Sequence, residues 1–204
     1  MGKGANVYVF RRRIILKIER NELVVSNTTI MNKTQDFLTF HMGNGKLSDG
    51  STASSFQTAL VEILSGKKKT HWSWYVMPTN MKSKSFGYRF ALDRNETIAY
   101  IRNDLLLSNY LVFMYAVSNK LESGISPETL LMSKTDVIKA YDSAKWFNQF
   151  GSYTNCELFN VTNKIINQLS GVVQEYMLEI MISSIDTKKY KQHSSLLNQI
   201  KRIN

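Results

Sequence analysis

Asp136, Lys139 and Asp142 are residues whose types and spacing fit a hydrolytic reaction. The spacing places Asp136 and Lys139 on neighbouring turns of an expected helix, where a carboxylate and an ammonium group form an ion pair. A lysine beside a carboxylate positions a water molecule or forms a Schiff base with a carbonyl substrate. Because such pairs are common on helix surfaces, a purely structural role is the favoured alternative.

A second set of reactive side chains lies in one short segment, where three lysines run into a histidine and three large aromatic residues. The set consists of Lys67, Lys68, Lys69, His71, Trp72, Trp74 and Tyr75. His71 is expected either as a hydrogen-bonded histidine at the core edge or as a general acid, since its charge changes near neutral pH. If the segment is extended, both tryptophans lie on one side of it. On that side they either stack against a nucleobase or pack into the core. We expect at least one of the two tryptophans to lie in the core.

The three lysines have a competing explanation in the helix that precedes them. Residues 54–65 carry apolar side chains at helical spacing, and Gly66 stands where a helix C-terminus is expected. Lysines at this position interact favourably with the negative end of the helix dipole. Glu62 is expected to face away from the apolar stripe and to neutralise these lysines.

Net charge and composition restrict the kinds of molecule that the protein is expected to bind. The 204 residues carry a formal net charge of +10, which favours a polyanion, either nucleic acid (DNA first) or a nucleotide derivative. Arg11, Arg12 and Arg13 are interpreted as a solvated face or, less favoured, as a phosphate clamp. The sequence lacks phosphate-binding and dinucleotide-binding glycine motifs, and its histidines and single Cys156 lack metal-ligand spacing. We therefore expect no cofactor and no metal.

Targeting signals are missing from the sequence. No apolar run approaches the length that spans a bilayer, and the N-terminus lacks a signal-peptide pattern. We therefore expect a cytoplasmic protein without a membrane partner.

The expected fold is mainly α, a single helical globular domain with an N-terminal β-hairpin. The hairpin occupies residues 1–34, where β-branched and aromatic residues flank a turn. The helical domain occupies residues 35–204, with a C-terminal helical extension from residue 151.

Local signals predict where helices begin and end. Asp93 and Glu96 form a capping box, and a further helix begins at Ser126-Pro127. Another helix opens at Thr135-Asp136 and is expected to stop at Gly151. Beyond it, Gly171 is expected to separate two helices over residues 154–169 and 172–185.

Several of these motifs occur in an order that resembles a mainly helical bacterial family, the domain of unknown function eighteen-ten, sometimes labelled calpastatin-like. The most specific segment follows a helix end and matches at Gly66, Lys68, Thr70, His71, Trp72, Trp74, Tyr75 and Pro78. Weaker patterns match at Phe90-Ala91-Leu92, Glu96, Ala99, Tyr100, Ile101, Leu106, Asp136, Lys139, Ser143 and Phe147. The resemblance covers about residues 37–150. It implies an all-helical fold and no established activity, in a layout distantly similar to helical hydrolases that remove ADP-ribose from nucleobases.

The function expected from these residues is hydrolysis of an N-glycosidic bond in nucleic acid or a nucleotide, as in a DNA base glycosylase. Asp136 or Asp142 supplies the charge that stabilises an oxocarbenium-like transition state, Lys139 orients the reacting groups, and His71 acts as the acid. The aromatic side chains hold an extruded base. Two alternatives stay open: a non-catalytic basic nucleic-acid-binding module, and a protein-interaction or regulatory domain whose hairpin adds strands to a partner sheet.

Overall fold

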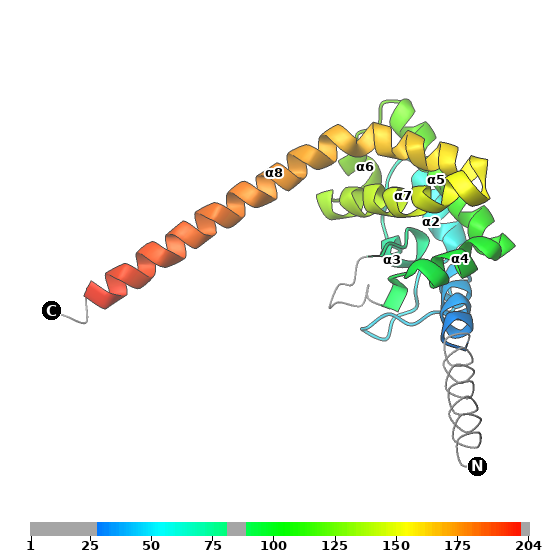
Figure 1. Ribbon diagram of the computed structural model, residues 1–204, viewed down its shortest axis with the longest axis horizontal. Coiled ribbons are helices and arrows are strands. Elements are labelled where there is room, and N and C mark those ends of the chain that lie inside the picture. The colour runs from blue at the N-terminus through cyan, green and yellow to red at the C-terminus, as the bar shows by residue number, and fades with distance from the viewer. Residues whose placement is uncertain (1–27, 81–88, 201–204) are drawn as a thin grey trace, which may run out of the picture. The chain divides into compact units, whose positions relative to one another are not determined.

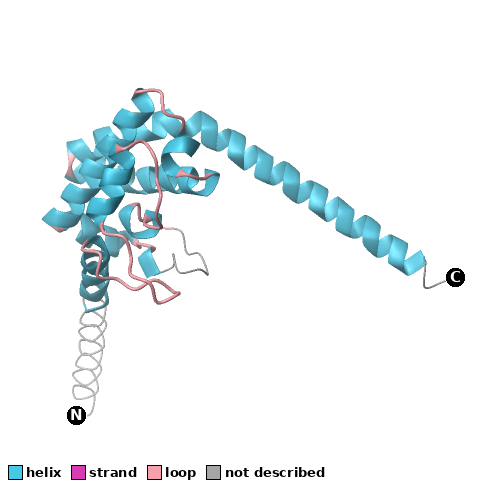
Figure 2. Ribbon diagram, turned by 180° about the vertical axis from the view of Figure 1, so that it is seen from behind, coloured by secondary structure: helices cyan, strands magenta, loops and turns pink. Residues whose placement is uncertain are grey.

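The computed structural model describes residues 28–80 and 89–200, with side chains over 28–80, 89–151 and 155–184. A helix over residues 28–41 is followed by α2 (Phe56–Leu64), α3 (Ser73–Val76), α4 (Arg94–Arg102), α5 (Asp104–Glu122), α6 (Pro127–Leu131), α7 (Lys134–Thr154) and α8 (Cys156–Ile200) (Figure 1). No strand occurs among the described residues (Figure 2), where the β-contacts reduce to an isolated bridge between Lys46 and Thr52. The prediction of a mainly helical chain is confirmed.

The predicted β-hairpin lies outside the described residues, because its expected strands precede residue 28. Residues 28–34, which the prediction assigned to the same N-terminal extension, belong to the first described helix. The expected boundary between residues 34 and 35 therefore falls inside a continuous helix.

The chain divides into two compact units. The first combines the residues up to Val61 with Thr70–Val112, and the second combines Glu62–Lys69 with the residues from Phe113 onward. The division falls within α2 and within α5, so each of these helices contributes residues to both units.

Aromatic side chains build the core of the first unit. The Phe37 ring lies edge-on to the rings of Phe90 and Tyr100, with centroids 5.3 and 5.1 Å apart. Phe40 packs against Tyr75 and Phe90 at 5.0 and 4.7 Å, and all five residues are buried. Since residues three apart share one face of a helix, the helix over residues 28–41 delivers both phenylalanines to this core.

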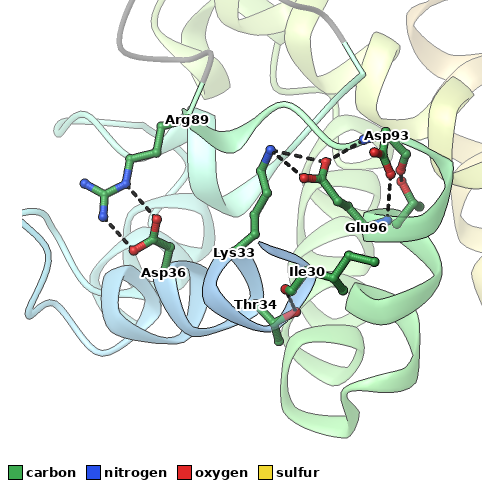
Figure 3. A network of polar contacts seen from close by, with 8 residues as sticks. Ile30, Lys33, Thr34, Asp36, Arg89, Asp93 and Glu96 are labelled. Carbon is green, nitrogen blue, oxygen red and sulfur yellow. Dashed lines mark hydrogen bonds and ion pairs between the residues drawn. The ribbon is translucent and has the colours of Figure 1, made fainter. Parts of the chain in front are cut away.

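Two ion pairs tie the helix over residues 28–41 to the rest of the first unit (Figure 3). Asp36 accepts two hydrogen bonds from the Arg89 guanidinium, at 3.0 and 2.6 Å. Lys33 pairs with Glu96 at 3.1 Å, and Glu96 also accepts the N–H of Asp93 at 2.8 Å. Asp93 in turn accepts the Glu96 N–H, which confirms the predicted capping box at the start of α4.

In the second unit α8 packs along α7, and one residue connects the two helices (Figure 1). Asn155 ends α7, since its N–H donates to the carbonyl oxygen of Gly151 at 2.9 Å. The Asn155 side-chain oxygen accepts the N–H of Leu158 at 3.0 Å and so caps the start of α8. The buried stripe of α8 then runs through Leu158, Val161, Ile165, Leu169 and Val173.

The predicted helix stop at Gly151 and the predicted break at Gly171 are both wrong. α7 continues past Gly151 to Thr154, and α8 runs through Gly171 without interruption. A Cβ atom at Gly151 would lie 2.6 Å from the backbone nitrogen of Phe159, in the first turn of α8. At Gly171 the same atom would meet nothing within 4 Å. Glycine is therefore needed at position 151, where two helices approach closely. At position 171 the helix faces open space and could carry a larger residue.

Alanine at these two glycines is expected to change stability in opposite directions. Gly151→Ala forces the backbone of Phe159 away, and overpacking of this kind costs about 1–3 kcal/mol. Gly171→Ala restricts the unfolded chain without any contact in the folded one, which stabilises by about 0.5–1 kcal/mol. Urea denaturation followed by circular dichroism measures both changes, and equal effects of the two substitutions would contradict these roles.

Candidate functional site

Lys68 is held by a tight turn at the end of α2. Gly66, with φ +86°, ends the helix, and its N–H and that of Lys67 both donate to carbonyl oxygens in the last turn of α2. This arrangement is the common glycine-terminated helix end, so the predicted stop at Gly66 is confirmed. The N–H of Lys68 then donates to the carbonyl oxygen of Leu130 in α6 at 2.8 Å. The backbone is therefore held to α2 just before Lys68 and to α6 at Lys68 itself.

Asp136 lies in the first turn of α7. The hydroxyl of Ser133 accepts the N–H of Asp136 at 3.2 Å and caps α7, which begins at Lys134, one residue before the predicted opening at Thr135. The N-terminal turn of a helix carries partial positive charge. The position therefore favours an ionised Asp136 carboxylate.

Lys68, Asp136 and Lys139 form a buried group of charges in the second unit, here called the lysine–aspartate cluster. The Nζ atom of Lys68 lies 2.5 Å from Oδ2 of Asp136, and Nζ of Lys139 lies 3.2 Å from Oδ1. The exposed fractions of the three side chains are 2% for Lys68, 7% for Asp136 and 11% for Lys139. An ammonium group at each oxygen favours the charged form of the carboxylate. Burial lowers the pKa of Lys139, and Asp136 acts in the opposite direction.

Asp142 stands further along α7 in a different environment. It is half-buried, and burial raises the pKa of its carboxyl group while nearby Lys145 lowers it. Six residues of α-helix rise about 9 Å, which is the separation of Asp136 and Asp142 along the helix axis. α7 thus carries one carboxylate beside two ammonium groups and a second that is partly removed from water.

The residues next to Lys68 differ from it in exposure. Lys67 and Lys69 are both exposed, whereas Glu62 is 6% exposed. The Glu62 carboxylate accepts the N–H of Lys69 at 2.8 Å. The prediction that Glu62 faces away from the core is therefore wrong, because this residue is buried and binds the backbone of the basic segment.

The histidine and the aromatic residues of the same segment belong to the first unit. Trp72 and Tyr75 are 0% and 1% exposed, and the Tyr75 hydroxyl donates to the carbonyl oxygen of Ser54 at 2.7 Å. Trp74 is half-buried and His71 is exposed. The segment is not extended, because the chain turns into α3, and helical residues two apart point in different directions. The expected core position of at least one tryptophan is confirmed by Trp72.

The predicted site residues are thus distributed over separate places. Lys68, Asp136 and Lys139 are in contact, and Asp142 lies on the same helix as the last two. The first unit holds His71, Trp72, Trp74 and Tyr75. Arg11, Arg12 and Arg13 lie outside the described residues.

His41 is a constrained residue that the sequence analysis did not single out. It is 6% exposed and stacks on Phe56 with ring centroids 5.5 Å apart. Its Nε2 lies 2.9 Å from the carbonyl oxygen of Tyr75, and its Nδ1 lies 3.0 Å from the amide nitrogen of Asn109. Burial lowers the pKa of His41 to about 4, so the ring is neutral. The available signal was its position four residues after Phe37, on the apolar stripe of the same helix.

Comparison with known proteins identifies a family that this chain matches. The sequence model of a family described as "Protein of unknown function (DUF1810)" matches residues 47–171, a range that contains the lysine–aspartate cluster and all of α7. No curated protein and no solved structure matches the chain. Among the described residues, no three His, Cys, Asp or Glu side chains gather as a metal site requires.

Proposed function

The chain belongs to the DUF1810 family of proteins of unknown function, and we propose that it hydrolyses N-glycosidic bonds in nucleic acid or in a nucleotide derivative. The observation that supports this activity is the pair of carboxylates on α7. Asp136 is charged beside Lys68 and Lys139, whereas burial raises the pKa of Asp142. Carboxyl groups in environments that favour opposite protonation states are typical of glycoside hydrolysis.

Water is the proposed nucleophile. Both oxygens of the Asp136 carboxylate are paired with ammonium groups, Oδ2 with Lys68 and Oδ1 with Lys139. We therefore assign no covalent intermediate to Asp136.

In the proposed reaction, a water oxygen bonds to the anomeric carbon of the sugar while the bond from that carbon to the base nitrogen breaks. Asp142 donates its proton to the departing nitrogen, and the proton that the water loses restores the Asp142 carboxyl group. The charged Asp136 stabilises the positive charge that develops on the sugar ring. Lys139, the most exposed member of the cluster, orients the substrate.

Release of free base from oligonucleotides and from nucleotide derivatives tests the proposal. Free base is detected by mass spectrometry, and abasic sites in oligonucleotides are detected by strand breakage in mild alkali. We expect Asp142→Asn to slow release at least about 100-fold with substrate binding retained, because general acid catalysis contributes about 10²–10⁴-fold. The matched control is Glu122→Gln, an exposed carboxylate of the second unit that pairs with Lys164, which should retain full activity.

The pH dependence of release supplies an independent check. Asp142 acts in its protonated form, so the rate should fall as the pH rises through the raised pKa of this group. An unchanged rate in Asp142→Asn would remove this carboxyl group from the reaction.

A second candidate function is a non-catalytic nucleic-acid-binding module. Exposed Lys67 and Lys69, on either side of Lys68, favour it because phosphate contacts need accessible cations. Binding of duplex DNA that weakens steeply between low and moderate salt, without base release from any substrate, is the result that would support this function over hydrolysis.

A further inference from the structure

A groove of about 580 Å³ lies between the helix over residues 28–41 and α4. From the first of these helices it is lined by Ile30 and Thr34 (Figure 3). From α4 it is lined by residues that share one face of the helix at a spacing of three and four: Asn95, Ile98, Ala99 and Arg102. The volume lies within the range of small-molecule binding sites. All of these residues belong to the first unit, whereas the lysine–aspartate cluster belongs to the second.

The polar side chains of this groove offer hydrogen-bond donors that the protein itself does not use. Arg102 and Asn95 are exposed, and neither side chain has a hydrogen-bond or ion-pair partner among the described residues. Asn103, which also lines the groove, caps α5 because its Oδ1 accepts the N–H of Leu106 at 3.1 Å. The two N–H groups on Nδ2 of Asn103 remain for a ligand. The guanidinium and an amide therefore stand at the same end of the groove.

The charge at this end favours an anion. No acidic residue of the described chain lines the groove. Glu96, the neighbour of Asn95, is already paired with Lys33. Asp104 is exposed and opens α5 without lining the groove. The N-terminal turn of α5, which Asn103 caps, adds partial positive charge to that of Arg102.

The middle of the groove is apolar. Ile98 and Ala99 lie between its polar ends on α4, and Ile30 adds a side chain from the other helix. Asn95 and Arg102 are seven residues apart, which corresponds to about 10 Å along the helix axis. None of the described lining residues is aromatic, so a nucleobase has no ring to stack on. The lining therefore fits an aliphatic body better than a base.

We propose that this groove binds a small aliphatic carboxylate, with its head group at Arg102 and Asn103 and its chain along Ile98, Ala99 and Ile30. A guanidinium presents paired N–H groups that match the two oxygens of a carboxylate. One arginine balances the single charge of a carboxylate, whereas a phosphate monoester carries about 1.5–2 charges. This site is independent of the proposed hydrolysis, because it shares no residue with α7 or with Lys68. Among the described helices, none has both the length and the apolar character needed to span a bilayer.

Isothermal titration calorimetry of the full chain tests the ligand class, with octanoate as the probe because its chain is of comparable length to the groove. We expect a dissociation constant below about 1 mM. Acetate lacks the aliphatic chain and octanamide lacks the charge, so each should bind at least about tenfold more weakly. Failure of octanoate to bind at millimolar concentration overturns the proposal. Equal affinity for octanoate and octanamide overturns the head-group contact, and equal affinity for octanoate and acetate overturns the aliphatic contact.

Substitutions in α4 test the location. Arg102→Gln removes the charge and Ala99→Met fills the middle of the groove, so each should raise the dissociation constant for octanoate at least about tenfold. Neither position is buried, so far-UV circular dichroism should be unchanged. The matched control is Arg94→Gln, at an exposed arginine of the same helix that does not line the groove, and it should leave the constant unchanged. Equal effects of Arg102→Gln and Arg94→Gln would mean that octanoate responds only to surface charge, which overturns the site.

Discussion

Replacement of Lys68 by methionine is expected to lower the free energy of unfolding by about 3–5 kcal/mol, the cost of breaking a buried ion pair by removing one partner. Methionine retains much of the lysine volume but removes the ammonium group 2.5 Å from Asp136. The Asp136 side chain is 7% exposed, so water does not replace the lost group. Lys139, at 3.2 Å, remains and keeps the loss near the lower end of this range.

Urea denaturation followed by far-UV circular dichroism measures this loss. Lys69→Met is the matched control, because Lys69 is the next residue, carries the same charge and is exposed. Its effect should stay within about 0.5 kcal/mol, as for other surface substitutions. If Lys68→Met and Lys69→Met cost the same, the lysine–aspartate cluster contributes nothing to folding.

A fall in pH from about 7 to about 4 is expected to remove about 3 kcal/mol of stability through His41 alone. The pKa of His41 is lowered from 6.5 to about 4 by burial, so the unfolded chain takes up its proton at a higher pH than the folded one. One pKa unit corresponds to about 1.4 kcal/mol. The stabilisation is complete above about pH 6.5 and is lost as the pH falls toward 4, since protons then bind the unfolded chain preferentially. A protonated ring also presents an N–H to the Asn109 amide nitrogen, where the neutral ring accepts a hydrogen bond.

Unfolding curves recorded at several pH values measure this contribution. His41→Gln removes the titrating ring, so its stability should decline less than that of the parent chain across the same window. His71→Gln, at an exposed histidine, serves as the control and should retain the decline. Identical pH profiles in His41→Gln and the parent chain would rule out His41 as the source.

The helix ends that were predicted correctly depend on groups close together in the sequence. The glycine at Gly66, the capping box at Asp93 and the start at Ser126-Pro127 each satisfy backbone groups within one turn. Such signals act before any tertiary contact forms, and the local order of residues is enough to indicate them. The mainly helical class follows from the same local information.

The candidate site depends on partners that sequence spacing does not reveal. Lys68 and Asp136 are 68 residues apart, as are His41 and Asn109. Three consecutive lysines therefore look equivalent in the sequence although one of them is buried. The pair of Asp136 and Lys139 was predictable because both belong to one helix, but its burial depends on Lys68 and was not.

A single residue, Asn155, separates α7 from α8, so its backbone determines which side of α8 faces α7. Asn155 closes the first helix with its N–H and opens the second with its side chain, so no spare residue separates them. An insertion or deletion at this corner would turn all of α8 by about 100° about its own axis. The stripe that begins with Leu158 would then leave the core as a whole. The corner between α7 and α8 is therefore expected to tolerate a substitution far better than a change in length.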